Sequence, residues 1–417
     1  MSWNNITVGD LIERAEAEVK TGPFGTQLRA SDYVETGTPV INVRNIGFGN
    51  IRHDKLEYIP DDVVTRLSGH LLRKGDIVFG RKGAVERHVY ITDAQNRWFQ
   101  GSDCLRLRLL SEANVLSKYL SFTFLTHEHQ SWMMQQCSHG ATMASLNQDI
   151  IKRIPLRLPS IEQQKIIVDI LSTYDDLIEN NTRRIEILEE MARRLYEEWF
   201  VHFRFPGHEE VSFKESELGE IPANWEVVQL KDIANNFDRK RKPLSKKQRS
   251  ERQGNYPYYG AAKIFDYIDD YLFDGRYLLL AEDGSVIDKD GFPVLQVANG
   301  RFWANNHTHI LQGKPPASTE FLFLALSRHP ISGYITGAAQ PKITQANMNR
   351  IPLVVGDLEI HTAFDRLIKP MFDMQETLEK KNANLRAQRD LLLPKLVSGE
   401  IDVSDITMPE DTEVEAA

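Results

Sequence analysis

The sequence has few cysteines and no long apolar run. Its 417 residues include only Cys104 and Cys137 as cysteines, too few for a disulfide scaffold and typical of reduced thiols. No apolar run approaches the roughly 18 residues of a membrane-spanning helix, and the first residues lack a secretion signal. With 41% hydrophobic and 26% charged residues, wholesale disorder is excluded. We expect a cytoplasmic chain without a membrane partner, built of two or three domains of about 100–200 residues each.

Catalytic and metal-binding signatures are also missing. Gly313-Lys314 is followed by Pro315, which cannot open a phosphate-binding loop. We find neither a glycine-rich turn suited to an adenosyl cofactor nor an Asn/Asp-Pro-Pro-aromatic string. The spacing of His127–His129 does not suit a metalloprotease helix, and two cysteines alone make no zinc site. We therefore predict no catalytic residue, no cofactor and no metal.

The net charge of −9 argues against a nucleic-acid partner, but the charge is unevenly distributed. From Glu400 onward there are seven acidic residues and no Lys or Arg, and without this tail 50 basic residues face 52 acidic ones. Residues 71–108 contain eight Lys/Arg against four Asp/Glu, and residues 239–252 contain eight against one. The whole-chain charge therefore hides two local basic stretches.

One segment of the sequence occurs twice. Gly140–Leu156 (GATMASLNQDIIKRIPL) and Gly337–Leu353 (GAAQPKITQANMNRIPL) align without a gap at an offset of 197, with seven of seventeen positions identical. Upstream, the surroundings of Trp3 parallel those of Trp225. Chance similarity of short apolar strings is the alternative, but matches in the same order favour a duplicated chain.

A long helical pattern follows each copy. The first opens at Ser160, spaced from Gln163 as in a capping box, and runs to Pro206 without internal proline or glycine. Seam positions then recur by four and three, which is heptad spacing. An amphipathic helix on a globular core is the alternative, but two helices of about 40 residues without core-sized partners favour a coiled coil. The expected seam residues are Tyr174, Ile178, Asn181, Ile185, Leu188 and Leu195 in the first helix, and Leu378, Asn382, Leu385, Leu392 and Leu396 in the second.

The two helices predict a spacer. At 1.5 Å per residue each would be roughly 60 Å long, which exceeds one DNA turn of about 34 Å. Antiparallel pairing would relate the halves by a pseudo-two-fold axis and hold the segments before each helix at opposite ends. One asparagine in each seam, Asn181 and Asn382, lowers stability but can fix the register.

The segments in front of the helices read as strands, loops and short helices. In each, a buried strand precedes a glycine-containing turn, Gly80–Gly83 (GRKG) and Glu282–Gly284 (EDG). Glycine permits close approach, and Arg or Lys beside it can reach phosphate or guanine. A plain hairpin with a solvated basic tip explains the same pattern. The run Arg239–Arg252 predicts a mobile surface loop, either solvated or bound to a DNA backbone.

These features resemble a known family, the specificity (S) subunits of type I restriction-modification systems. The strings that carry the resemblance are Gly22–Gly25, Gly75–Phe79 with Gly83, Ile154–Ile166, Leu177–Asn181 and Arg389–Ile401. It covers essentially the whole chain to about Ile401. The second copy departs from the first, because Glu282-Asp283 replaces Arg81-Lys82, so a basic contact cannot be carried over at that turn.

The resemblance implies an α+β fold, with two mixed α/β target-recognition domains separated by two long helices that pair as an antiparallel coiled coil. The expected parts are a first recognition domain at 1–158, a spacer helix at 159–204, a second recognition domain at 205–355, a second spacer helix at 356–400, and a disordered acidic tail at 401–417.

The resemblance also implies a subunit that is not an enzyme. Each domain would read one half of a bipartite, asymmetric site in double-stranded DNA, and the helices would set the gap between the halves. The helices would also dock two methyltransferase subunits, which bind S-adenosylmethionine, and restriction/translocase subunits that use ATP would join. A stand-alone DNA-modifying enzyme and a coiled-coil scaffold without a DNA role remain the alternatives.

The expected DNA contacts follow from chemistry and from position in the family pattern. Phosphate contacts would set the position on the duplex, and base-edge contacts would confer sequence specificity. The candidates in the first domain are Arg81, Lys82, Arg87, His88, Ser138 and His139, and those in the second are Arg241, Lys242, Tyr258, Tyr259, Lys263 and Lys342.

Overall fold

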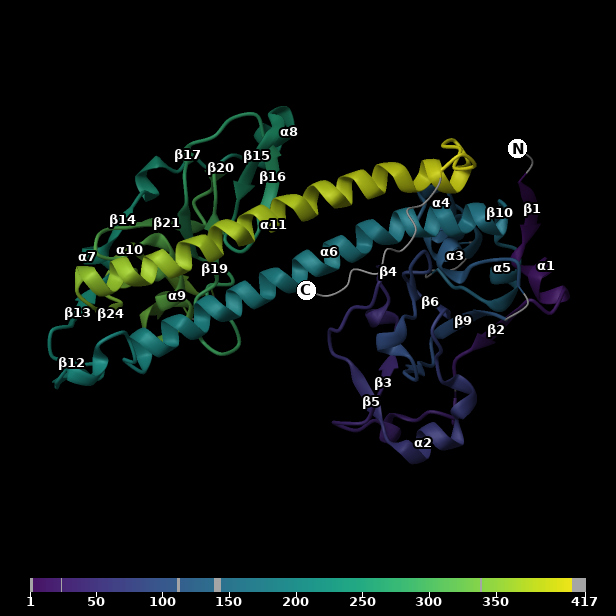
Figure 1. The fold of residues 1–417 in the computed structure, drawn as a ribbon, viewed down its shortest axis with the longest axis horizontal. Helices are drawn as coiled ribbons and strands as arrows, with labels where there is room; N and C mark the ends of the chain where they lie inside the picture. The colour runs from purple at the N-terminus through teal and green to yellow at the C-terminus, as the bar shows by residue number, and fades with distance from the viewer. Residues whose placement is uncertain (1–2, 24, 111–112, 139–143, 338–339, 407–417) are drawn as a thin grey trace. The chain divides into compact units, whose positions relative to one another are not determined.

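The structure is a computed structural model that describes residues 3–23, 25–110, 113–138, 144–337 and 340–406. It divides into two compact units (Figure 1). Unit 1 combines Met1–Ile178 with Ala383–Ala417, and unit 2 is the continuous segment Glu179–Asn382. Each unit thus joins one expected recognition domain to parts of both long helices. None of the described helices is both long and apolar enough to cross a membrane.

Unit 1 is built around a five-stranded sheet with an apolar centre. β6 (Ile77–Gly80) is buried at every position, as its sequence Ile-Val-Phe-Gly predicts, and it pairs antiparallel with strands on both sides. The sheet order is β2 (Ala17–Thr21), β9 (Cys104–Leu109), β6, β7 (His88–Tyr90) and β4 (Phe48–Gly49). A second sheet has the order β5 (Glu57–Ile59), β3 (Thr38–Ile41) and β8 (Phe99–Gln100), and β1 (Asn4–Thr7) pairs with β10 (Pro155–Leu158).

Helices complete the core of unit 1. Buried side chains of the sheet, such as Phe79, pack in one cluster with Tyr119 and Phe122 and with Leu171 and Leu393 from the long helices. Burial of these apolar surfaces is the main stabilising contribution. The helices are α1 (Val8–Glu13), α2 (Asp61–Arg66), α3 (Ser117–Phe124), α4 (His127–Cys137), α5 (Gln148–Lys152), the start of α6 (Ile161–Tyr196) and the end of α11 (Leu358–Ser398).

Unit 2 is organised in the same way. Its central strand, β18 (Tyr277–Ala281), is also buried throughout. The two main sheets have the orders β14 (Ala234–Asn236), β21 (Thr308–Gly313), β18, β19 (Leu295–Ala298), and β16 (Ile264–Ile268), β15 (Gln253–Tyr259), β20 (Arg301–Ala304), β17 (Phe273–Asp274). The pairs are β11 (Phe213–Ser216) with β12 (Gly219–Pro222), β13 (Glu226–Gln229) with β24 (Pro352–Val355), and β22 (Ile335–Thr336) with β23 (Lys342–Ile343). The short helices are α7 (Leu230–Ile233), α8 (Lys246–Glu251), α9 (Thr319–Ser327) and α10 (Gln345–Met348).

The internal repeat is confirmed by strand register and by helix caps. Thr7 lies opposite Pro155 in the β1–β10 pair, and Gln229 lies opposite Pro352 in the β13–β24 pair. At the helix that follows, the Thr7 backbone N–H donates to Asp10 at 2.6 Å, and the Gln229 backbone N–H donates to Asp232 at 3.3 Å. The two units therefore share a topology.

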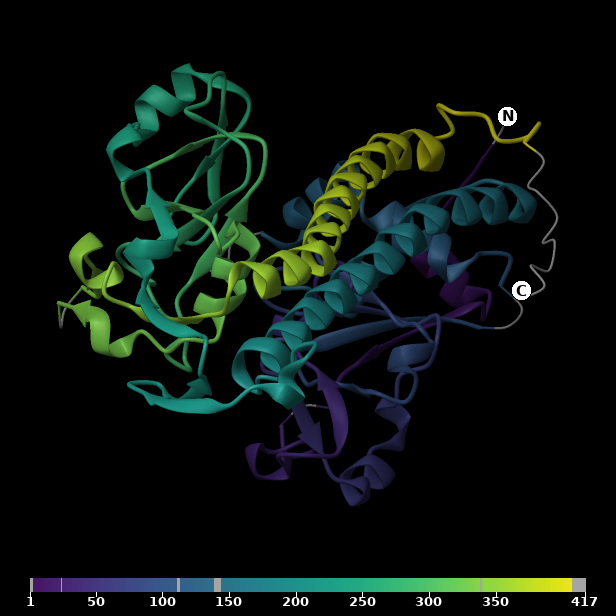
Figure 2. The same ribbon diagram turned by 60° about the vertical axis from the view of Figure 1, so that its left-hand side comes forward.

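The predicted antiparallel coiled coil is present in both units. In unit 1, Arg389 Nη1 on α11 donates to Asp175 Oδ1 on α6 at 2.6 Å. In unit 2, Gln375 Nε2 donates to Glu189 Oε1 at 2.8 Å. Within unit 2, Asn181 pairs with Asn382 and Glu189 pairs with Gln375, so the residue number falls on α11 as it rises on α6. The paired segments therefore run in opposite directions, and the two helices lie side by side (Figures 1 and 2).

The seam positions are buried to different degrees. α6 begins at the expected cap, where the Gln163 backbone N–H donates to Ser160 Oγ at 3.3 Å, and it ends in a π-turn at Glu197–Val201. Ile178, Asn181, Leu378, Asn382 and Leu396 are buried, whereas Tyr174, Ile185, Leu188, Leu195, Leu385 and Leu392 are partly exposed. Two of the partly exposed residues, Leu195 and Leu392, also pack against the core clusters of unit 2 and unit 1.

The start of the expected disordered tail is ordered. Val403 is only 2% exposed and packs into the core cluster of unit 1, and Gln163 Nε2 donates to Ser404 Oγ at 2.8 Å. Residues 401–406 are thus part of the fold, and the apolar side chain of Val403 explains why. The remainder of the tail, 407–417, lies outside the described residues.

Candidate nucleic-acid interface

The turn after β6 is fixed by backbone hydrogen bonds to two other segments. The Arg81 N–H donates to Asp103 O at 2.8 Å, and the Leu146 N–H donates to Arg81 O at 2.8 Å. Gly83 has a φ of +77°, which favours glycine at that position. The turn therefore presents the side chains of Arg81 and Lys82 from a rigid backbone.

Neither cation of this turn is strongly bound by an acidic side chain among the described residues. The guanidinium of Arg81 makes no ion pair or side-chain hydrogen bond with the residues that the structure describes. Lys82 Nζ lies 3.6 Å from Asp103 Oδ1, in a pair that is more than half exposed on both sides. Exposed pairs of this kind contribute little, so both side chains are available to a phosphate or a base edge.

The two neighbouring candidates in the first domain are more constrained. The Arg87 guanidinium lies 5.2 Å from the ring centre of Phe48, and its Nε is 3.4 Å from Glu86. His88 is fully buried in β7, and its Nε2 lies 2.9 Å from Ser121 Oγ. Burial lowers the pKa of His88 to about 3, so the ring is neutral. The prediction that His88 contacts DNA is therefore wrong, because its side chain points into the core.

The loop candidates after α4 are only partly described. Ser138 is exposed, but its hydroxyl donates to Met134 O at 2.6 Å and so closes the helix. Its contact with DNA stays a prediction. His139 lies outside the described residues.

The turn after β18 occupies the same backbone position in the second domain. The Glu282 N–H donates to His307 O and the Ile343 N–H donates to Glu282 O, both at 2.9 Å. The isolated bridge between Lys82 and Ser145 corresponds to the bridge between Asp283 and Lys342. Glu282 is thus the structural counterpart of Arg81, and Lys342 is the counterpart of Ser145.

Two predicted cations meet on Glu282. Arg241 Nη1 lies 2.6 Å from Glu282 Oε2, and Lys342 Nζ lies 3.1 Å from Glu282 Oε1. The side chain of Glu282 is 12% exposed, that of Arg241 15%, and that of Lys342 47%. Burial works to raise the pKa of Glu282, but Arg241, His309 and Lys342 outweigh it and hold the pKa below its usual value. The carboxylate is therefore ionised at neutral pH.

A second acid lies beneath this cluster. Asp238 Oδ2 is 2.5 Å from His309 Nδ1, and Asp238 Oδ1 accepts a hydrogen bond from the Ile310 N–H at 2.9 Å. His309 Nε2 is 3.0 Å from Ile343 O. Because a carbonyl only accepts, that nitrogen carries a proton. Burial acts to raise the pKa of Asp238, but the contacts with His309, Ile310 and Arg241 lower it on balance.

The same acids and histidine could be taken for a metal site. One ligand atom each from Asp238, Glu282 and His309 lie within 4.8 Å of one another. However, Arg241 and Lys342 already pair with Glu282, so a divalent cation would face two like charges. The arrangement fits an ion-pair network.

The basic run of the second domain is more ordered than predicted. Part of it forms α8, and the Lys242 carbonyl accepts a hydrogen bond from Trp303 Nε1 at 2.6 Å. The Leu244 N–H donates to the Tyr258 hydroxyl at 2.9 Å, and the Arg249 guanidinium lies 5.1 Å from the Tyr258 ring. The mobile-loop prediction is corrected accordingly. Tyr258, at 1% exposure, anchors the run and is not a DNA-contacting residue.

The remaining candidates of the second domain are Lys242 in the basic run, Tyr259 at the end of β15 and Lys263 in the turn that follows it. Lys242 and Lys263 are exposed, and Gln296 Nε2 donates to Gly260 O at 3.0 Å, which holds the turn before Lys263. Tyr259 packs edge-on against Phe302 at 5.4 Å between ring centres, and burial raises its pKa to about 12. Lys242 and Lys263 stay candidates for DNA contact, whereas the Tyr259 ring is engaged mainly in packing against Phe302.

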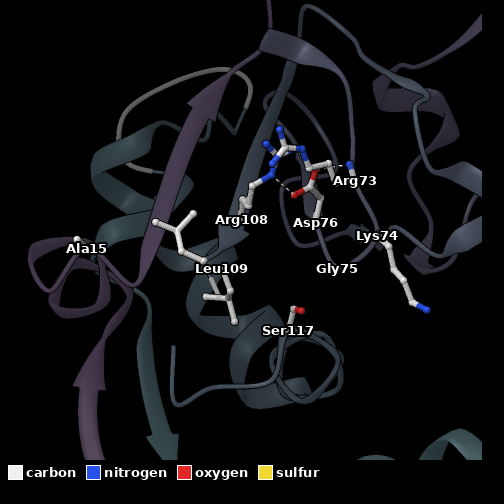
Figure 3. Close-up of a pocket in the computed structure, with 9 residues that line it drawn as sticks. Ala15, Arg73, Lys74, Gly75, Asp76, Arg108, Leu109 and Ser117 are labelled. Carbon is white, nitrogen blue, oxygen red and sulfur yellow. Dashed lines mark hydrogen bonds and ion pairs between the residues drawn. The ribbon is translucent and has the colours of Figure 1, made fainter. Parts of the chain in front are cut away.

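A cavity of about 510 Å³ lies near the first domain's basic stretch (Figure 3). Arg108 donates to both carboxylate oxygens of Asp76 at 2.7 Å, so its charge is already matched. The Lys74 side chain points away from this pair (Figure 3) and lies 2.7 Å from Asp93. Two of the three cations that line the cavity, Arg108 and Lys74, are therefore already paired with a carboxylate.

Sequence reasoning missed several exposed aromatic side chains. Phe48 is 44% exposed, and Phe265 and Tyr267 on the edge strand β16 are 49% and 51% exposed. Phe265 and Tyr267 are two residues apart, so they lie on the same side of the strand. The alternating placement of these aromatic residues was visible in the sequence. Which side of the strand would be covered by the rest of the protein was not.

Comparison with known proteins supports the same interpretation. The family described as "Type I restriction modification DNA specificity domain" matches residues 2–190 and again residues 222–387. The chain belongs to this family. The two matches fall on the two copies of the internal repeat, and the family implies DNA sequence specificity without a catalytic site in this subunit.

Individual relatives match between a third of the chain and most of it. The type I restriction enzyme MjaIX specificity subunit of Methanocaldococcus jannaschii is 26% identical over 372 residues, which cover 84% of this chain and 82% of the relative. The putative specificity subunit S.HindORF215P of Haemophilus influenzae is 34% identical over 139 residues, which cover 33% of this chain and 35% of the relative. The crystal structure of an S subunit from M. genitalium has a similar fold, with a TM-score of 0.61 at 15% identity, covering 95% of this chain and 96% of that one.

Proposed function

We propose that this protein selects the DNA sequence on which a type I restriction-modification complex acts. Each recognition domain reads one half of a bipartite, asymmetric site. The observation that carries the proposal is the pair of equivalent turns with opposite charge. The Arg81 side chain has no ion pair or hydrogen bond among the described residues, whereas Glu282 at the same backbone position binds Arg241 and Lys342. Two domains that share a topology but differ in this surface suit two different half-sites.

The paired helices set the gap between half-sites and dock two methyltransferase subunits. Support comes from apolar side chains that stay exposed on the helices, namely Leu177 and Leu391 in unit 1 and Ile187, Met191, Leu367 and Met374 in unit 2. A docked subunit would remove these apolar side chains from water. Restriction/translocase subunits join through this assembly, and genomic DNA as the substrate implies a cytoplasmic protein.

The protein itself is not an enzyme. The methyltransferase partners bind S-adenosylmethionine and carry out the methyl transfer, and this chain selects the DNA sequence. Its formal net charge of −9 implies weak binding to DNA when it is alone. Affinity for DNA therefore rises sharply when the methyltransferase subunits are added.

Mapping of adenine methylation tests the proposal. Cells that express this chain together with its methyltransferase partner should show a methylated motif of two short sequences separated by a fixed gap, and the partner alone should show none. Methyl transfer by the purified chain without a partner would establish a stand-alone enzyme instead. Absence of any motif would support a scaffold without a DNA role.

A further inference from the structure

We propose that Glu282 is a positioning residue of the second recognition domain. It holds Arg241 and Lys342 in one geometry at the recognition turn and so keeps them from binding phosphate regardless of sequence. This inference rests on the proposed function, because it assumes that the turn faces DNA.

The charges of this surface are rearranged relative to the first domain. There, the cations are on the turn itself, at Arg81 and Lys82. In the second domain the turn carries Glu282, and one cation stands on the facing segment, at Lys342, where the first domain has Ser145. Both domains thus present positive charge at this place, but in the second domain a carboxylate lies between the cations.

Glu282 has little capacity to read a base. Each of its oxygens already accepts from a cation, at 2.6 Å from Arg241 and 3.1 Å from Lys342, and its side chain is 12% exposed. A reading carboxylate would have to accept from a cytosine amino group. Glu282 therefore acts on DNA through the two cations.

The acid and histidine beneath fix the geometry further. His309 Nδ1 is 3.8 Å from Glu282 Oε2, and its Nε2 binds the carbonyl of Ile343, the residue next to Lys342. Asp238 ties His309 to the segment that carries Arg241, since Arg241 Nη2 lies 3.5 Å from Asp238 Oδ2. Both cations are thereby held by side chains and by neighbouring backbone. A cation fixed in this way strengthens binding only to a duplex whose phosphate or base lies at the matching position.

The test compares Glu282→Gln with Glu320→Gln. Glu320 is a matched control, because it is also a buried acid of unit 2, 2.7 Å from Arg276, and its replacement changes the net charge equally. The full-length chain with its methyltransferase partner is titrated with three duplexes. One contains the motif found by methylation mapping, one contains that motif with its first half scrambled, and one contains it with its second half scrambled. The titrations are repeated at several salt concentrations.

Release of Lys342 predicts a specific pattern, because Arg241 remains bound to Asp238 and to the Thr308 carbonyl in the variant. Glu282→Gln binds the duplex with the scrambled second half about tenfold tighter than the unmodified protein does, and its salt dependence steepens by about one unit, as expected for one added phosphate contact. Discrimination against the scrambled first half and the behaviour of Glu320→Gln stay unchanged. Equal effects of both variants, or equal loss at both half-sites, would overturn the inference.

A second variant covers the case in which Glu282→Gln does not fold. Lys342→Ser installs the residue found at the equivalent position of the first domain, and the Lys342 side chain is 47% exposed, so the fold tolerates it. We expect weaker binding of the motif and a salt dependence shallower by about one unit. An unchanged salt dependence contradicts the inference, whereas an unmodified complex without any bipartite motif contradicts the proposed function itself.

Discussion

Asn181 and Asn382 bind each other across the helix seam of unit 2, with Asn181 Nδ2 donating to Asn382 Oδ1 at 2.9 Å. Asn382 Nδ2 also donates to Thr182 Oγ1 at 3.2 Å. The two asparagines are 9% and 2% exposed, so neither amide has ready access to water. A shift of either helix would place these amides against apolar side chains, and the pair therefore specifies the register.

Replacing one member of this pair should destabilise the protein. In Asn181→Leu the amide of Asn382 loses a buried partner, which costs about 1–3 kcal/mol of the free energy of unfolding. Urea unfolding followed by far-UV circular dichroism measures the loss. In the double variant Asn181→Leu/Asn382→Leu both amides are gone, and most of the lost stability returns. A double variant as unstable as the sum of the singles would contradict this account.

Arg81→Ala should relax specificity at a single base. If the free guanidinium reads a guanine, its loss costs about 1–3 kcal/mol of binding at that position only. Competition titrations with duplexes altered at one base at a time measure the effect. Lys82→Ala is the control, because an exposed lysine that contacts phosphate weakens binding equally for all sequences. Uniform weakening by Arg81→Ala as well would place Arg81 on phosphate.

Acid should destabilise the protein from about pH 6.5 downward. Burial lowers the pKa of His88 and His129 to about 3 and that of His361 to about 4. The unfolded chain takes up these protons near pH 6.5, and the folded protein does not until pH 3–4. The stability that is fully present above pH 6.5 is thus lost progressively as the pH falls, by about 1.4 kcal/mol per pH unit for each histidine. Urea unfolding at several values between pH 5 and 8 measures this slope.

His361 offers a control for that slope. Neither of its ring nitrogens has a hydrogen-bond partner among the described residues, and its ring packs against Phe321 at 4.5 Å between centres. His361→Leu should keep its stability at pH 7.5 and lose less on acidification. A slope that is the same in this variant would locate the acid sensitivity elsewhere.

Lengthening the helix pair should change the gap of the DNA site. Seven residues inserted after Leu188 in α6, with seven more inserted opposite, beside Gln375 in α11, add one heptad to each helix. At 1.5 Å per residue this is about 10 Å, or roughly three base pairs. Methylation mapping should return the same two half-sites with a longer gap. Insertions of five residues are the control, because they break the heptad pattern and should abolish assembly.

The long-range features of the recognition surface could not be read from the sequence. The helices were predictable because heptad spacing is a local signal, and the glycine turn at Arg81 was predictable for the same reason. No local sequence pattern predicts the cluster of Arg241, Glu282 and Lys342, because its members are 41 or more positions apart in the sequence. His88 was misplaced because a histidine after Arg87 looks like part of a basic surface, whereas β7 is covered on both faces and buries both His88 and Val89.

Aromatic residues near the basic run illustrate the same limit. Tyr258 looked like a stacking residue because it lies in an aromatic string beside Lys and Arg. Its hydroxyl instead accepts from Leu244, a contact fourteen residues distant that fixes the run and removes the ring from the surface. Distinguishing an anchor from a contact requires knowing which side of β15 is covered.

The packing of Val403 has a consequence for the order in which the chain folds during synthesis. Unit 2 is one continuous segment, Glu179–Asn382, whereas the core of unit 1 includes Leu393, Leu396 and Val403. A ribosome that has released everything up to Asn382 has delivered all of unit 2 but an incomplete unit 1. The half of the protein made first therefore finishes folding last, and until then its apolar surface stays open to chaperones or to other nascent chains.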